Sequence, residues 1–147
     1  MRDEKAAGKE EGAVSRYWPC WKQIGISQDR YRELLHFCRQ YPDWKAEANS
    51  LLGIRAIKMD GQPHGSGKSD PVAMAAEKRD KLLSKIKLVD DCARDIGGGE
   101  WYAALIQNVC IGKSYEQLDR ALMPTSFRQE FFSMRRQFFE LLNKRTE

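Results

Sequence analysis

The chain of 147 residues has the length of about one domain, and its composition of 41% hydrophobic and 31% charged residues is typical of a globular protein, which excludes disordered and collagen-like classes. No apolar run approaches the roughly 20 residues that span a bilayer, so we expect no membrane segment. The 25 Lys and Arg residues exceed the 21 Asp and Glu residues, and the net charge of +4 allows nucleic-acid binding without requiring it. Residues 1–15 are charged and lack the apolar stretch of a secretory signal, which predicts a cytoplasmic protein.

The cysteines and histidines form no pattern typical of a metal site or a catalytic centre. Cys20, Cys38, Cys92 and Cys110 are widely spaced, and only His36 lies close to one of them, on a predicted helix where the two side chains diverge. We therefore expect no metal and no cofactor, and we expect the cysteines to be reduced and to pack as small hydrophobic residues.

Two further patterns are excluded as sites. The Gly-Lys-Ser run at 67–69 resembles the end of a phosphate-binding loop, but Gln62 occupies the position where that motif needs glycine. Asp90, Asp91 and Asp95 form an acidic cluster, but adjacent carboxylates on a helix diverge by about 100°, which favours a solvated face. The sequence therefore predicts a protein that is not an enzyme.

The N-terminal part is predicted to hold a flexible tail over 1–16 and a helical segment over 17–53. The aromatic stretch that includes Trp18 and Trp21 is expected to pack irregularly onto the body, with a partner-binding patch as the alternative. Ser27 is a suitable N-cap for a helix over 28–41. Pro42 interrupts this helix, and a shorter helix over 43–52 is predicted to end at Gly53.

Residues 54–70 are rich in glycine and are predicted to form a loop, in which Ile54–Met59 can form a brief extended segment. Asp70 followed by Pro71 is a strong helix start. One apolar stripe continues from there, so a long central helix is expected over 71–96, and Gly97, Gly98 and Gly99 end it. No strand pattern is visible, which predicts an all-α fold.

The C-terminal region 97–147 is predicted to contain a helix-turn-helix. Ser114 with Gln117, and Ser126 with Gln129, each have the spacing of a capping box at a helix start. The helices expected here cover 100–111 with Gly112 at its end, 114–122, and 127–143, and Pro124 lies in the turn before the last one.

The last helix is amphipathic in this interpretation. Its predicted buried stripe contains Phe127, Phe131, Met134, Phe138 and Leu141, and its far side contains Gln129, Ser133, Arg136 and Glu140. Arg and Gln side chains on such a face can read guanine and adenine in the major groove. The predicted DNA-contacting residues are Lys113, Ser114, Arg120, Thr125, Ser126, Arg128, Gln129, Ser133 and Arg136. The alternative is a helical hairpin with ordinary solvated arginines.

Four segments together are similar to a known family. They are YRELLHFCRQYP at 31–42, Asp70-Pro71, GKSYEQL at 112–118 and RRQFFELL at 135–142. In this order they resemble the RinA/ArpU-type late transcription regulators of phages and prophages of Gram-positive bacteria. The resemblance implies a C-terminal helix-turn-helix similar to region 4 of sigma factors.

Within this resemblance, Ser126 matches the serine that opens the recognition helix, and residues 127–136 match that helix. The implied function is transcriptional control of phage genes through double-stranded DNA, with contact to host RNA polymerase, in the cytoplasm of a bacterial host. Phe132 is interpreted as part of a second packing face rather than as an intercalating side chain.

Two other functions remain open at this stage. A phage DNA-packaging accessory, such as a small terminase-like subunit, would also use a helix-turn-helix and would assemble as a ring. A helical protein-binding module would expose Trp18, Trp21 and the phenylalanine-rich last helix. The long helix over 71–96 allows a homo-oligomer in each case.

Overall fold

The computed structural model describes residues 19–58 and 70–147, with backbone alone for 54–58. Every regular element in these two ranges is helical, which confirms the all-α prediction. The predicted tail, Trp18 and most of the glycine-rich loop lie outside the described residues. No described helix is long and apolar enough to cross a membrane.

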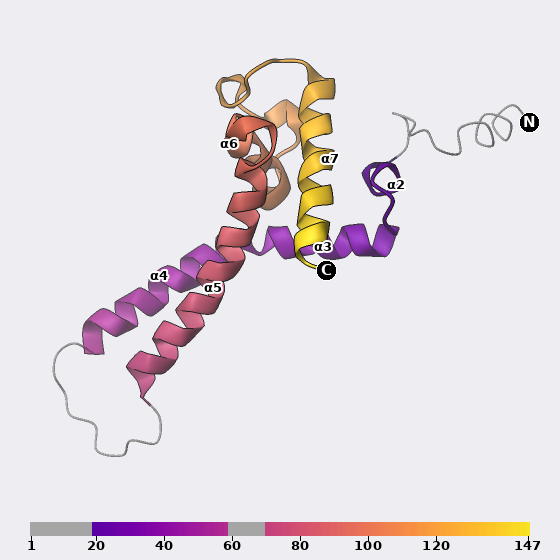
Figure 1. The fold of residues 1–147 in the computed structure, drawn as a ribbon. Helices are drawn as coiled ribbons and strands as arrows, with labels where there is room; N and C mark the ends of the chain where they lie inside the picture. The colour runs from indigo at the N-terminus through magenta and orange to yellow at the C-terminus, as the bar shows by residue number, and fades with distance from the viewer. Residues whose placement is uncertain (1–18, 59–69) are drawn as a thin grey trace, which may run out of the picture.

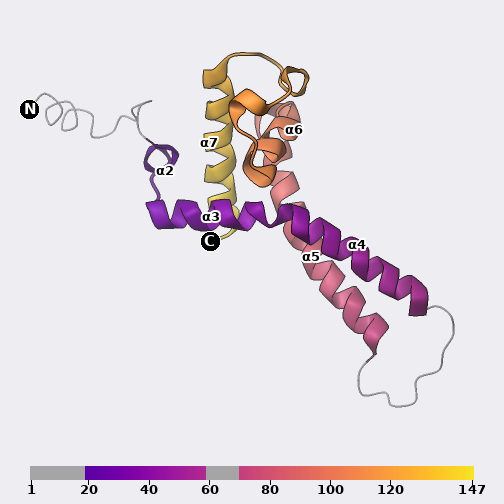
Figure 2. The same ribbon diagram turned by 180° about the vertical axis from the view of Figure 1, so that it is seen from behind.

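The helices form a body and a projecting hairpin (Figures 1 and 2). Helix α3 (Gln28–Arg39) crosses beneath α7 (Arg128–Arg145), while α6 (Tyr102–Leu105) lies beside α7. Helices α4 (Tyr41–Lys58) and α5 (Pro71–Arg94) pack along each other, and both views show this pair extending away from the body. The C-terminal half of α5 returns to the body and joins its core.

The start of α3 follows the prediction, and α4 does not. The Ser27 hydroxyl accepts a hydrogen bond of 3.0 Å from the Arg30 backbone N–H, as expected of an N-cap. The predicted break near Pro42 is present, since α3 ends at Arg39 and α4 begins at Tyr41, and Pro42 lies in the first turn of α4, where a backbone N–H has no helical partner. The expected end at Gly53 and the extended segment after it are wrong through residue 58, since α4 continues to Lys58.

The long central helix is confirmed. The Asp70 carboxylate accepts from the Val72 N–H at 3.0 Å, and Pro71 occupies the first helical position. Helix α5 ends at Arg94, slightly before the predicted end, and Gly97, Gly98 and Gly99 follow it with φ of 58°, 73° and 83°. Three consecutive left-handed residues are tolerated there because glycine lacks a Cβ atom.

The acidic cluster on α5 is less uniform than predicted. Asp91 pairs with Lys87 in the solvent, as expected of a solvated face. Asp90 is half-buried instead, and its Oδ1 accepts hydrogen bonds from the hydroxyls of Tyr41 at 2.7 Å and Tyr102 at 2.6 Å. This carboxylate therefore joins the starts of α4 and α6 to α5.

The segment before α7 differs most from the prediction. The capping box of Ser114 and Gln117 forms, but it opens only a single 3-10 turn, η3 (Tyr115–Gln117). A second 3-10 turn, η4 (Arg120–Leu122), follows after extended backbone at Leu118 and Asp119. The predicted α-helix over 114–122 is therefore wrong. Tyr115, Leu118 and Met123 are all buried, and the irregular path turns each of them inward.

Helix α7 begins at Arg128, and the second predicted capping box, of Ser126 and Gln129, is absent at its start. The Thr125 hydroxyl is placed there instead, where it donates to the Glu130 carboxylate at 2.6 Å and accepts from the Phe127 N–H at 3.4 Å. Phe127 is 66% exposed, which corrects its assignment to the buried stripe.

The buried face of α7 is rotated relative to the prediction, because α3 covers a second side of the helix. Phe131 and Phe138 are buried as expected, while Phe139 and Leu142 are buried as well. The rings of Phe139 and Tyr31 on α3 lie 4.9 Å apart. Met134 and Leu141, predicted to be buried, are only partly covered.

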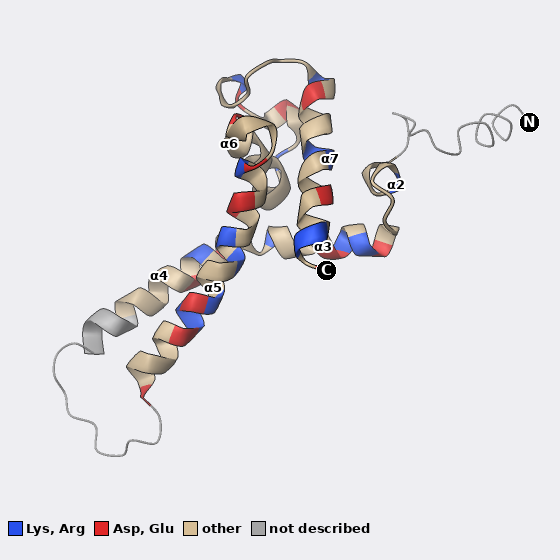
Figure 3. Ribbon diagram, viewed as in Figure 1, with Lys and Arg blue, Asp and Glu red and all other residues tan. Residues whose placement is uncertain are grey.

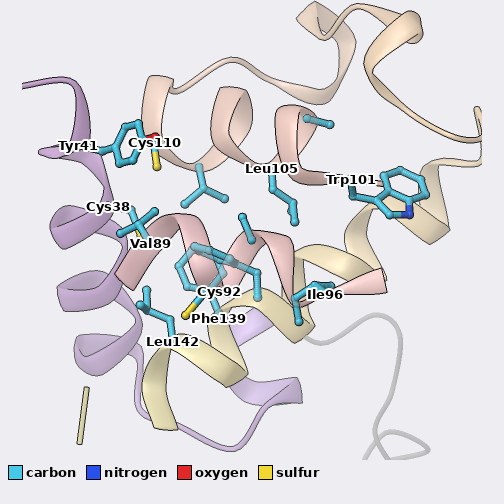
Figure 4. Close-up of a cluster of buried hydrophobic side chains, with 14 of the residues drawn as sticks. Cys38, Tyr41, Val89, Cys92, Ile96, Trp101, Leu105, Cys110, Phe139 and Leu142 are labelled. Carbon is cyan, nitrogen blue, oxygen red and sulfur yellow. The ribbon is translucent and has the colours of Figure 1, made fainter. Parts of the chain in front are cut away.

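The core combines α3, α4, α5, α6, α7 and the segment 106–111 that follows α6, and three of the four cysteines are part of it (Figure 4). Cys38, Cys92 and Cys110 are 0–2% exposed and unpaired, which confirms that they pack as small hydrophobic residues. Cys20, the fourth, is only half-buried. Burial raises the pKa of the Cys92 and Cys20 thiols above the usual value. Over residues 19–58 and 70–147, no group of three metal-ligating side chains comes together.

Candidate nucleic-acid interface

The outward face of α7 carries the polar residues that the sequence placed there. Gln129 and Glu140 are exposed, and Ser133 and Arg136 are half-exposed. The opposite face is held by Phe131 and Phe138, which are at most 1% exposed. The polar row is therefore presented on a helix that is firmly anchored in the core. Arg136 makes no hydrogen bond or ion pair with any described residue, so its guanidinium is available to a ligand.

Arg128 is exposed but not free. Its guanidinium forms an ion pair with the Glu116 carboxylate and lies 5.0 Å and 5.1 Å from the ring centroids of Tyr115 and Phe132. The hydrogen bond from Arg128 lowers the pKa of Glu116, so the two charges largely compensate each other near neutral pH. DNA would have to replace this carboxylate to recruit Arg128.

The predicted residues of the preceding segment have mixed roles. Arg120 is exposed and lies 5.7 Å from the Tyr115 ring, on which Arg128 also converges. Ser114 is occupied in its capping box, and Thr125 is hydrogen-bonded to Glu130. The Ser126 carbonyl accepts from the Tyr115 hydroxyl at 3.1 Å, which ties the start of α7 to η3.

Lys113 is exposed, and its side chain makes no hydrogen bond or ion pair with a described residue. It follows Gly112, whose left-handed φ of 96° ends the π-helical segment η2 (Ile106–Ile111) that continues α6. The expected helix over 100–111 is therefore present as α6 and η2 together. Lys113 and Arg120 are the two cations of this segment that remain available for phosphate contacts.

Sequence reasoning missed two arginines that extend the surface beside Arg136. Arg135 donates from Nε to the Asn108 Oδ1 at 2.7 Å, and its guanidinium lies 5.0 Å from the Phe139 ring, which fixes it in place. Arg32, on α3, is exposed and lies 3.8 Å from Asp29. All three arginines line a groove between α2 (Cys20–Gln23), α3 and α7. Because the lining residues of α7 come more than 90 positions after those of α2 and α3, only the folded chain brings them together.

The charges on α7 do not form a stripe of one sign. Figure 3 shows acidic and basic positions following each other along α7 and α5. Over residues 112–147 seven basic residues stand against five acidic ones, a net of +2. Such a surface attracts phosphate weakly over long range, so any recognition must depend on short-range contacts.

Comparisons with known proteins give no further guidance, since no family model, no curated protein and no solved structure matches this chain.

Proposed function

We propose that the protein is a DNA-binding regulator of transcription in which α7 is the recognition helix. The observation that carries the proposal is the row of Gln129, Ser133 and Arg136, which is exposed or half-exposed on a helix whose other side is buried. The spacing of three and four residues places these side chains on one edge of the helix, the arrangement by which a helix reads bases in the major groove.

The chemistry of the row suits base recognition. Arg136 has no partner within the described chain and can donate two hydrogen bonds to guanine, and the Gln129 amide can pair with adenine. Lys113 and Arg120, both exposed, would contact the phosphates on the side of η3 and η4. These turns replace the first helix of a helix-turn-helix and hold the start of α7 through Tyr115.

The regulatory part of the proposal comes from the resemblance to the RinA/ArpU-type proteins. It places the protein in a bacterial host, where it controls phage or prophage genes and contacts host RNA polymerase. A homo-oligomer on a repeated site is compatible with this role.

The test is a salt-titrated gel shift against genomic fragments of the element that encodes the protein. Arg136→Ala is expected to weaken binding to the selected fragment by about 1–3 kcal/mol and to relax the sequence preference. Lys144→Ala is the matched control. Lys144 is exposed on the last turn of the same helix, and its substitution removes one positive charge, as Arg136→Ala does. Equal isotherms for these two variants would remove α7 as the reading helix.

A further inference from the structure

The groove between α2, α3 and α7 has a volume of about 680 Å³. Its apolar walls are Trp21 from α2, Leu35 from α3 and Phe132 from α7, and its cations are Arg32, Arg135 and Arg136. A concavity of this size, with apolar walls and a few charged groups, is typical of ligand-binding sites in proteins.

The charge in the groove is of one sign. Three arginines line it together with His36, and no Asp or Glu is among its lining residues. Arg136 has no partner in the described chain, and Arg32 has only the 3.8 Å contact with Asp29, whose side chain is 94% exposed. Two guanidinium groups are therefore available to an anionic ligand at the edge of an apolar surface.

The aromatic rings of the groove favour a peptide over nucleic-acid bases. Stacked bases need free ring faces, but Arg135 lies 5.9 Å from the Tyr31 ring and Arg128 lies 5.1 Å from the Phe132 ring. Trp21 is the one half-buried ring of the groove that has no ring contact with another described residue. A single free indole can hold one apolar side chain but cannot form a platform for successive bases.

The wall that carries Trp21 lies at the edge of the core, against which Cys20 and Ile24 pack as partly buried residues. Helix α2 is one turn long and contributes no fully buried residue. It is separated from α3 by Gly25, whose φ is 79°. A wall of this kind can adjust to a ligand and gains buried apolar area when one binds.

We propose that this groove binds a short acidic segment of a partner protein. An apolar side chain of the segment packs against Trp21, Leu35 and Phe132, and flanking carboxylates pair with Arg32 and Arg136. The groove shares Arg136 with the outward row of α7, whereas Trp21 and Arg32 belong to the groove alone, so substitutions at these two residues test the peptide site without touching the row proposed for DNA.

The test begins with selection of random displayed dodecapeptides on the full-length protein, followed by fluorescence anisotropy of the enriched peptide. The enriched peptides are expected to be acidic and to carry one aromatic or aliphatic anchor. Arg32→Glu and Trp21→Ala are each expected to weaken binding at least about tenfold. Lys144→Glu, an exposed charge reversal at the end of α7, is expected to stay within about twofold. Circular dichroism of each variant establishes that it is folded. If Trp21→Ala does not fold, Arg32→Glu still tests the proposal, because Arg32 is exposed and its substitution leaves the core intact.

Cys20 gives a second readout without any substitution. It lines the groove and is half-buried, while the other three thiols are at most 2% exposed. Alkylation of Cys20 by iodoacetamide is expected to slow at least about fivefold when the peptide saturates the groove, because the bound chain covers the thiol.

Three results would overturn the proposal: no enriched peptide, peptides that bind the wild type and Arg32→Glu equally, or displacement of the peptide by a single-stranded oligonucleotide. The last result would assign the groove to nucleic acid. Failure of the proposed DNA-binding function is distinguishable, because Trp21→Ala is expected to leave the gel shift unchanged.

Discussion

Asp90 connects three helices through one carboxylate, and its removal tests the junction between the hairpin and the body. Its Oδ1 accepts from Tyr41 on α4 at 2.7 Å and from Tyr102 on α6 at 2.6 Å. A hydrogen bond to a charged group contributes about 1.5–3 kcal/mol, and a half-buried site belongs at the low end of that range because water replaces part of the loss. Asp90→Ala is therefore expected to lower the free energy of unfolding by about 2–3 kcal/mol.

The assay is urea unfolding followed by far-ultraviolet circular dichroism, with a thermal scan alongside. In a chain of this length the loss corresponds to a fall in Tm of about 5–10 °C. Asp90→Asn keeps an acceptor oxygen and is expected to cost only about 1 kcal/mol. Asp91→Ala is the matched control on the same helix, because its ion pair with Lys87 is exposed and contributes little.

Equal stability of Asp90→Ala and Asp91→Ala would refute this reasoning. A double-mutant cycle refines it, since Tyr102→Phe and Asp90→Asn share one hydrogen bond and their effects should not add. Strict additivity would mean that the two side chains do not meet in solution.

Three further predictions concern the core, the glycines and pH. Phe131 is fully buried, so Phe131→Ala is expected to lower the free energy of unfolding in urea by about 3–5 kcal/mol. Phe127 is 66% exposed, so Phe127→Ala should change this free energy by no more than about 0.5 kcal/mol. Similar losses for the two variants would contradict the observed buried face of α7. Gly53 lies inside α4 with open space around it, so Gly53→Ala should stabilise the protein by about 0.5–1 kcal/mol. The alanine of Gly112→Ala must adopt a φ of 96°, so this variant should be destabilised by at least about 1 kcal/mol. Thermal scans that rank the two variants the other way would contradict the backbone conformations of these two positions. Burial, aided by the hydrogen bond to Asp90, raises the pKa of Tyr41. A folded-state pKa above the unfolded value of about 10 contributes stability below that pH and loses it as pH rises, so unfolding should become easier above about pH 10. Tyr41→Phe should reduce this loss of unfolding free energy above about pH 10, measured by urea unfolding at a series of pH values. The same pH dependence in Tyr41→Phe and in the wild type would argue against the assigned role of Tyr41.

The interior of this protein could be predicted only in part from its residues. Phe131 and Phe138 were identified by helical spacing alone, and both are fully buried. Phe139 and Leu142 were not, because spacing gives a single stripe and α7 is covered on two sides. Helical spacing predicts an outward row of Gln129, Ser133 and Arg136, of which Gln129 is exposed and the other two are half-exposed. The groove beside this row could not be predicted, since its residues come from distant segments.

The sequence by itself determined where several helices begin and end. Ser27 and Asp70 cap the helices they precede, and Gly97 and Gly112 follow the ends of two helical segments. These signals act within a few residues of each other, so the local sequence contains all the groups that form them.

The tertiary structure decided the rest. Gly53 lies within a helix because α4 packs along α5, and this packing outweighs a propensity cost of about 1 kcal/mol. The segment after Ser114 gives up a predicted helix because extended backbone at Leu118 brings apolar side chains into the core. Asp90 is half-buried rather than solvated because two tyrosines from other helices reach it. In each case burial against distant residues contributes more free energy than the local preference it overrides.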